Sequence, residues 1–130
     1  MIIFGDDGFR DIYGTNLLSI KFLNQFFNNL NFLLSKKKIT KIIIGYDNRV
    51  SNKSILRIIL KNIKFVKKIL ILKTPISTPC LQYLSKTEEC FGIMITASHF
   101  PWKYNGFKFF IDGSKLSKND EVYLEKKIYQ

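Results

Sequence analysis

Short apolar runs alternate along the chain with longer stretches in which apolar residues recur at helical spacing. The runs have the length of strands and lie at 2–4, 38–47, 67–73, 91–97 and 105–112. After the first run, apolar residues spaced three and four apart predict a helix; they are Ile20, Leu23, Phe27, Leu30 and Leu34. A second stripe, Ile55, Ile59 and Ile63, predicts another helix between the second and third strands.

Polar residues and a proline mark where helices are expected to begin. The expected caps or first-turn residues are Thr15, Ser51, Pro79 and, together with Asp120, Ser117. The third helix is expected to end near Lys86 and the last near Tyr129. An Asn-Gly pair at 105–106 predicts a turn into the final strand, which then pairs antiparallel with 91–97.

Strands that alternate with helices predict one domain over 1–130, of α/β class. We expect a three-layer α/β/α sandwich with a mixed, mostly parallel sheet. In such sheets ligands gather beyond the carboxyl ends of the strands. Four polar loops are candidates for that edge, at 5–10, 46–51, 74–79 and 98–106.

Composition narrows the class of protein. A chain of 130 residues can bury a core without disulfides or metal. No apolar run approaches the roughly 20 residues of a membrane span, and the start lacks the features of a signal peptide. Cys80 and Cys90 show neither zinc spacing nor a disulfide framework. We therefore expect reduced thiols, a cytoplasmic protein and no membrane partner.

The net charge of +11 raises the question of a nucleic-acid partner. Of the 21 basic residues only three are arginines, whereas bidentate phosphate and base contacts favour arginine. The lysine clusters lie at expected element ends, where solvated lysines are common. We expect a solvated basic surface and no nucleic-acid partner; an anionic small-molecule substrate is compatible with this charge.

The stretch ITASHFP ends a buried-looking strand on Ser98 and His99. Adjacent side chains rarely form a Ser–His hydrolase pair, and no G-x-S-x-G elbow is present. The plainer interpretation is a loop serine beside a histidine with its own partner. The alternative is a serine that carries a phosphoryl group, which needs nearby cations. Lys103 and Lys108 follow it, and Gly106 permits a close backbone approach.

Two other loops contain charged residues between glycines or before a helix. Asp6, Asp7 and Arg10 are typical either of a phosphate-binding loop or of an Asx-type turn with an exposed arginine. Asp47 and Arg49 are expected to pair and hold their loop, and only secondarily to form an anion site.

Four stretches occur in order along the chain: FGDDGFR, IIIGYDNRVSN, PISTPCLQYLS and GIMITASHFPWKYNGFKFF. In this combination the chain resembles the first domain of the α-D-phosphohexomutase superfamily, and most of all its bacterial phosphoglucosamine mutase branch. The resemblance covers essentially the whole of 1–130. It implies an intramolecular phosphotransferase that converts a hexose phosphate through a 1,6-bisphosphate.

The resemblance also implies roles for four residues. Ser98 falls on the catalytic serine that carries the phosphoryl group and binds Mg²⁺ through its phosphate. Lys108 and His99 match catalytic residues near proton transfer. Arg10 matches the first-loop arginine, which supports that chemistry and, like Lys108, contacts the substrate's phosphate.

The chain departs from the family pattern in sequence and in length. Phe100 stands where the family has asparagine, Asp6 where it has a threonine-like residue, and Asp11 where it has glycine. Family members have four domains, and motifs of the second to fourth are absent here. The resemblance therefore implies a domain that needs the missing domains as partners and is inactive alone. A phosphomannomutase or phosphoglucomutase domain, or a non-catalytic sugar-phosphate-binding remnant, is the alternative.

Overall fold

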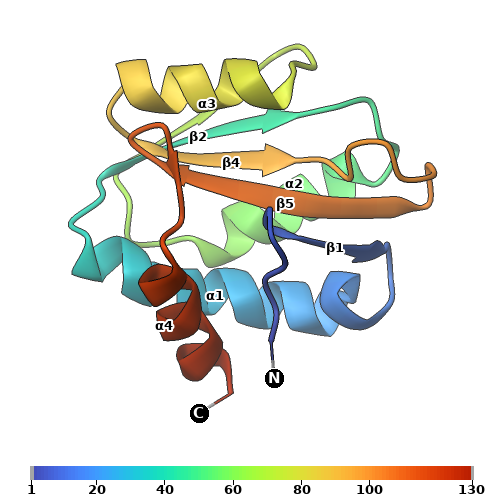
Figure 1. The fold of residues 1–130 in the computed structure, drawn as a ribbon, viewed down its shortest axis with the longest axis horizontal. Coiled ribbons are helices and arrows are strands. Elements are labelled where there is room, and N and C mark those ends of the chain that lie inside the picture. Colours follow the sequence, from blue (N-terminus) through green and yellow to red (C-terminus); the bar gives the residue numbers. More distant parts are fainter. Residues whose placement is uncertain (1, 130) are drawn as a thin grey trace.

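The structure, a computed structural model that describes residues 2–129, contains a sheet flanked by helices (Figure 1). The strands are β1 Phe9–Ile12, β2 Lys41–Tyr46, β3 Lys68–Ile71, β4 Phe91–Ile95, β5 Tyr104–Ile111 and β6 Ser114–Lys115. The helices are the 3₁₀ turn η1 Asn16–Leu18, then α1 Ile20–Lys36, α2 Asn52–Asn62, α3 Thr78–Thr87 and α4 Lys118–Ile128.

The sheet has the strand order β1-β5-β4-β2-β3, and β6 pairs with β5. β2 is parallel to β3 and β4, whereas β5 is antiparallel to both β1 and β4. The expected mixed α/β sheet is confirmed, although only two of its strand pairs are parallel. The carboxyl ends of β2, β3 and β4 lie at one edge, together with the start of β5 and the end of β1.

Helices cover both faces of the sheet, as expected for three layers (Figure 1). α1, α2 and α4 pack on one face through the larger core, in which phenylalanines from α1, β1 and β5 contact one another. α3 packs alone on the other face around Leu81, Met94 and Phe110. Phe107 and Phe109 point into the larger core, so Lys108 between them points to the α3 face. By the same alternation Phe9 is buried and Arg10 points to the α3 face, where it is exposed.

The prediction of a strand at 2–4 is wrong. These residues have no regular structure, and the backbone N–H groups of Ile3 and Phe4 donate instead to the Glu125 carboxylate, at 2.7 and 3.3 Å. The first strand is β1, which begins inside the loop expected at 5–10. It forms because a turn closed by the Gly5 N–H and the Gly8 carbonyl sets the chain beside β5.

Several expected caps and turns also need correction. α1 is capped by Ser19, which accepts a hydrogen bond from the Phe22 N–H, and not by Thr15. Ile20 is consequently outside the apolar stripe and exposed, whereas the other four stripe residues are buried. Ser51 precedes α2 but makes no capping bond, and Asn105 with Gly106 lies inside β5 rather than in a turn.

Other helix signals are confirmed. Pro79 lies in the first turn of α3, which ends at Thr87, one residue beyond the expected end. Ser117 accepts a hydrogen bond from the Asp120 N–H and caps α4. The antiparallel pairing of β4 with β5 is as expected. None of the helices in residues 2–129 is long and apolar enough to span a membrane.

Candidate active site

Ser98 lies in the loop that leaves β4 and turns back into β5. Its side chain is exposed, and its backbone has φ 55°, in the left-handed region. For a residue other than glycine this conformation costs about 1–2 kcal/mol, so surrounding contacts must hold it. One of them is the hydrogen bond that the Ser98 N–H donates to Thr96 Oγ1, at 2.9 Å.

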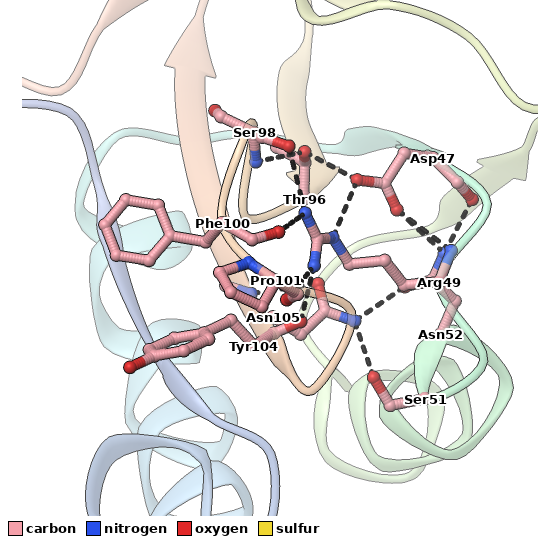
Figure 2. A network of polar contacts seen from close by, with 11 residues as sticks. Asp47, Arg49, Ser51, Asn52, Thr96, Ser98, Phe100, Pro101, Tyr104 and Asn105 are labelled. Atoms are coloured by element: carbon pink, nitrogen blue, oxygen red, sulfur yellow. Dashed lines mark hydrogen bonds and ion pairs between the residues drawn. The ribbon is translucent and has the colours of Figure 1, made fainter.

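Arg49, in the loop after β2, extends its guanidinium toward the backbone of this serine loop (Figure 2). Its Nε donates to Asp47 Oδ2 at 3.2 Å, so the expected pairing of these two residues is confirmed. Its two terminal nitrogens each donate to two backbone carbonyls of the serine loop. The acceptors are Ser98 and Phe100 for Nη2, at 2.9 and 2.8 Å, and Pro101 and Tyr104 for Nη1, at 2.7 and 3.0 Å.

The Asp47 carboxylate connects the two sides of the Ser98 backbone. Its Oδ2 accepts from Thr96 Oγ1 at 2.7 Å, and that hydroxyl accepts in turn from the Ser98 N–H. Its partner Arg49 holds the Ser98 carbonyl. Both polar groups of the serine backbone are therefore tied to one carboxylate at the end of β2.

Asn105 joins the start of β5 to the start of α2. It is fully buried, and its Nδ2 donates to Ser51 Oγ and Asn52 Oδ1, both at 2.7 Å. Asn52 itself donates to the Asp47 carbonyl at 2.7 Å. The hydroxyl of Ser51, which was expected to cap α2, therefore accepts a hydrogen bond from Asn105 instead. These bonds hold the loop after β2 and the start of β5 in fixed positions relative to each other (Figure 2).

Arg10 reaches the serine loop through an aromatic ring. Its guanidinium carbon lies 4.2 Å from the centre of the Phe100 ring, and that ring packs edge-on against Tyr104 with centroids 5.1 Å apart. Across the sheet Arg10 faces Gly106, where a Cβ would lie 2.6 Å from the Arg10 Cβ. The close approach expected at Gly106 is therefore to β1, and it makes room for the arginine.

Lys108 lies two residues further along β5, on the same face as Arg10. Its ammonium pairs with Asp7 at 3.0 Å, and its side chain is only 14% exposed; Lys115 pairs with the same carboxylate at 3.4 Å. Burial is the largest single influence on the Asp7 pKa and raises it. Hydrogen bonds and charge from Lys108 and Lys115 together outweigh burial, so the pKa of Asp7 is lowered from its ordinary value of 3.8.

His99 is exposed beside Ser98. Within residues 2–129 it makes no hydrogen bond or ion pair, so the histidine with a partner that one interpretation expected is not observed. The structure brings Arg10 to the Ser98 loop and places Lys108 farther along the same face. The roles expected of these four residues stay predictions.

The sequence analysis missed or undervalued three groups that hold the serine loop. They are the long side chain of Arg49, the hydroxyl of Thr96 and the buried amide of Asn105. The one sequence signal was the Asp47–Arg49 pair, which correctly indicated a loop-holding role. The structure also places Asp11 and Asp6, two of the departures from the family pattern. Asp11 Oδ2 accepts from the Leu17 N–H at 3.4 Å beside η1, and Asp6 is exposed.

In the described part of the chain, no three His, Cys, Asp or Glu side chains gather as a metal site. Mg²⁺ prefers near-octahedral oxygen coordination. The donors present therefore do not make a magnesium site by themselves.

The sequence was compared with known proteins. Residues 1–130 match the model of the family described as phosphoglucomutase/phosphomannomutase, α/β/α domain I. The chain is 36% identical over 124 residues to a phosphoglucosamine mutase of Pseudoalteromonas atlantica and covers 28% of that protein, with 94% of this chain aligned. It is 35% identical over 135 residues to a phosphoglucosamine mutase of Nautilia profundicola, covering 30% of that protein and all of this chain.

A solved structure has the same fold. The open form of pp63/parafusin, a phosphoglucomutase from Paramecium, has a TM-score of 0.83 at 21% identity, covering 98% of this chain and 25% of that one. The chain spans less than a third of the length of each of these relatives. It belongs to the phosphoglucomutase/phosphomannomutase family, in which it corresponds to the α/β/α domain I.

Proposed function

We propose that this chain is the phosphoserine-bearing domain of a phosphohexomutase that converts glucosamine 6-phosphate to glucosamine 1-phosphate. The observation that carries the proposal is the presentation of Ser98: an exposed hydroxyl on a left-handed backbone whose N–H and carbonyl are both held. Similarity to phosphoglucosamine mutases supports the choice of substrate. A phosphomannomutase or phosphoglucomutase domain is the alternative, because the family model that matches is described as phosphoglucomutase/phosphomannomutase.

In the proposed reaction the Oγ–P bond of phosphorylated Ser98 breaks as a hydroxyl of the hexose phosphate bonds to phosphorus. That hydroxyl loses its proton, the departing serine oxygen takes up a proton to become a hydroxyl again, and a 1,6-bisphosphate results. The intermediate turns round, and its other phosphoryl group returns to Ser98, whose hydroxyl proton leaves in the same way. Because the moving group is anionic throughout, positioning and charge stabilisation provide most of the catalysis.

The side chains of this domain supply part of that stabilisation. Arg10, held over Phe100, is the proposed phosphate ligand near Ser98. Lys108, in its ion pair with Asp7, is the proposed second cation on the same face, and His99 beside Ser98 is the proposed proton carrier. A resident Mg²⁺ would add charge neutralisation; Ser98 would offer it one phosphate oxygen, and its other ligands must come from elsewhere.

The proposal extends to the partners and the cellular location of this chain. The relatives are more than three times as long as their aligned part, so substrate grip and the remaining metal ligands are assigned to domains other than this one. A cytoplasmic location, and the absence of nucleic-acid and membrane partners, stay predictions from the sequence.

The test is phosphorylation of Ser98 by a hexose 1,6-bisphosphate while the other domains are supplied by the Pseudoalteromonas atlantica relative without its own first domain, followed by peptide mapping of the modified serine in this chain. We expect one phosphoryl group on Ser98 in the unsubstituted chain and in Ser54→Ala, which alters an exposed serine of α2. Ser98→Ala is expected to take up none while unfolding at the same denaturant concentration, because an exposed hydroxyl contributes little to stability.

Two outcomes would redirect the proposal. Binding of the bisphosphate with no transfer, and equal binding by Ser98→Ala, would favour a sugar-phosphate-binding remnant. Loss of the fold in Ser98→Ala would make Ser98 a structural residue.

A further inference from the structure

All five N–H groups of the Arg49 guanidinium are engaged within the domain. One donates to Asp47, and the other four donate to carbonyls between Ser98 and Tyr104. The side chain is only 10% exposed. Since an arginine has five donors and no acceptor, none remains for a phosphate. Arg49 is thus the least suited of the nearby cations to bind substrate, although the sequence allowed an anion site here.

The four carbonyls determine where two functional groups lie. The Ser98 carbonyl points to the guanidinium while its side chain points away from it, so the bond to Nη2 orients the hydroxyl outward (Figure 2). The neighbouring bond, from Nη2 to the Phe100 carbonyl, fixes the residue whose ring lies against Arg10. The Arg49 side chain, which is only 10% exposed, therefore positions both Ser98 and the ring that contacts Arg10.

We propose that Arg49 is a positioning residue for phosphoryl transfer. It holds the Ser98 hydroxyl and the Phe100 ring in their positions without contacting the phosphate. This rests on the proposed function. Lysine cannot replace it, because an ammonium has three donors and no planar fork to reach acceptors on two sides.

The experiment compares Arg49→Lys with Arg57→Lys, which makes the same change at an exposed position of α2. The rate of Ser98 phosphorylation is measured against the concentration of a hexose 1,6-bisphosphate, with the other domains supplied by the Pseudoalteromonas atlantica relative without its own first domain. For Arg49→Lys we expect the maximal rate to fall roughly 10- to 100-fold, the scale of a misplaced reacting group, at an unchanged half-saturating concentration. Arg57→Lys is expected to match the unsubstituted chain in both quantities.

Backbone amide exchange of residues 98–104 provides a second readout that needs no donor. We expect faster exchange in Arg49→Lys and no change in Arg57→Lys. If Arg49→Lys does not fold, Thr96→Val replaces it, because it removes the acceptor of the Ser98 N–H and leaves the guanidinium in place; the same fall in maximal rate is expected.

The outcomes separate the inference from the proposed function. A higher half-saturating concentration with an unchanged maximal rate would make Arg49 a phosphate ligand and overturn the inference. Equal rates and equal exchange in the two lysine variants would also overturn it. If the unsubstituted chain takes up no phosphate even with the relative's other domains present, the proposed function fails; unchanged exchange in Arg49→Lys would then reject the loop-holding role as well.

Discussion

Phe100, one of the departures from the family pattern expected from the sequence, has its ring against Arg10. A ring face attracts a guanidinium through its quadrupole, which at an exposed site is worth about 0.5–1 kcal/mol. The Phe100 ring therefore gives Arg10 an interaction that orients its guanidinium beside the serine loop.

Replacing Phe100 by leucine is expected to slow Ser98 phosphorylation by roughly two- to fivefold, the equivalent of that contact. The measurement is the rate of phosphate uptake from a hexose 1,6-bisphosphate. Phe100→Tyr, which keeps the ring, serves as the control. Equal rates for leucine and tyrosine would show that the Arg10 contact has no influence on transfer.

Asp7 makes the stability of the domain depend on pH. Its folded pKa is lowered below 3.8 by Lys108 and Lys115 against the opposing effect of burial. The ion pair therefore stabilises the fold at pH values above 3.8, and this stabilisation is lost as the pH falls through the lowered pKa. The pair is partly solvated, so its contribution at neutral pH is at most about 1 kcal/mol.

The prediction is that Asp7→Asn lowers the free energy of unfolding at neutral pH and that the difference shrinks below pH 3.8. Urea unfolding at several pH values measures it. Asp6→Asn controls for net charge, because Asp6 is exposed and makes no ion pair within residues 2–129. A difference that persists unchanged into acid would mean that the Asp7–Lys108 contact is not its cause.

Individual site residues were predictable from sequence only where a local pattern identifies them. Ser98, Arg10 and Lys108 stand in recognisable stretches, and the Asp47–Arg49 pair spans three positions. The four carbonyl contacts of Arg49 join residues about fifty positions apart. Backbone acceptors leave no trace in residue identity, so no single sequence indicates such contacts.

Among the elements, β1 depends on Gly8. This residue has φ 76°, and a Cβ there would lie 1.8 Å from the Phe107 carbonyl oxygen of β5. Gly14 has a similar φ of 89° but has nothing within 4 Å of a Cβ position. The two glycines therefore separate the cost of backbone strain from the cost of a steric clash.

We expect Gly8→Ala to destabilise the domain by roughly 3 kcal/mol or more, because both strain and clash apply. Gly14→Ala is expected to cost about 1–2 kcal/mol, the strain alone. Denaturant unfolding gives both values. Similar losses for the two variants would contradict the close pairing of β1 with β5 at this point.

The two errors in predicting strands, at 2–4 and at β1, have one physical origin. The apolar run at 2–4 has the composition of a strand but no neighbouring strand to pair with, whereas β1 contains two charged residues and pairs with β5. The antiparallel partner decided the outcome over local composition. Long stripes such as that of α1 were predicted well, because one face of a helix reports burial directly.

At the scale of the molecule, alternation of strands and helices was enough to predict the α/β class and a loop-lined edge. It was not enough to place α3 alone on one face, which leaves Arg10 exposed there. The chain covers 28% and 30% of the two relatives, and our proposal assigns part of the reaction to domains other than this one.

The isolated 130-residue chain is therefore expected to show no sustained interconversion of glucosamine phosphates. Adding the Pseudoalteromonas atlantica relative without its own first domain is expected to restore turnover, measured as glucosamine 1-phosphate formed. The same mixture with Ser98→Ala is the control and is expected to stay inactive. Sustained turnover by the chain alone would refute the assignment of substrate grip to other domains.

The most direct test of the central claim is the intact mass of the protein isolated from its native cells, before and after phosphatase treatment. Our account predicts a mass that falls by one phosphoryl group on treatment, with the modified peptide containing Ser98. A mass that phosphatase leaves unchanged, with Ser98 unmodified in every molecule, would contradict the claim that this domain carries the phosphoserine of a mutase.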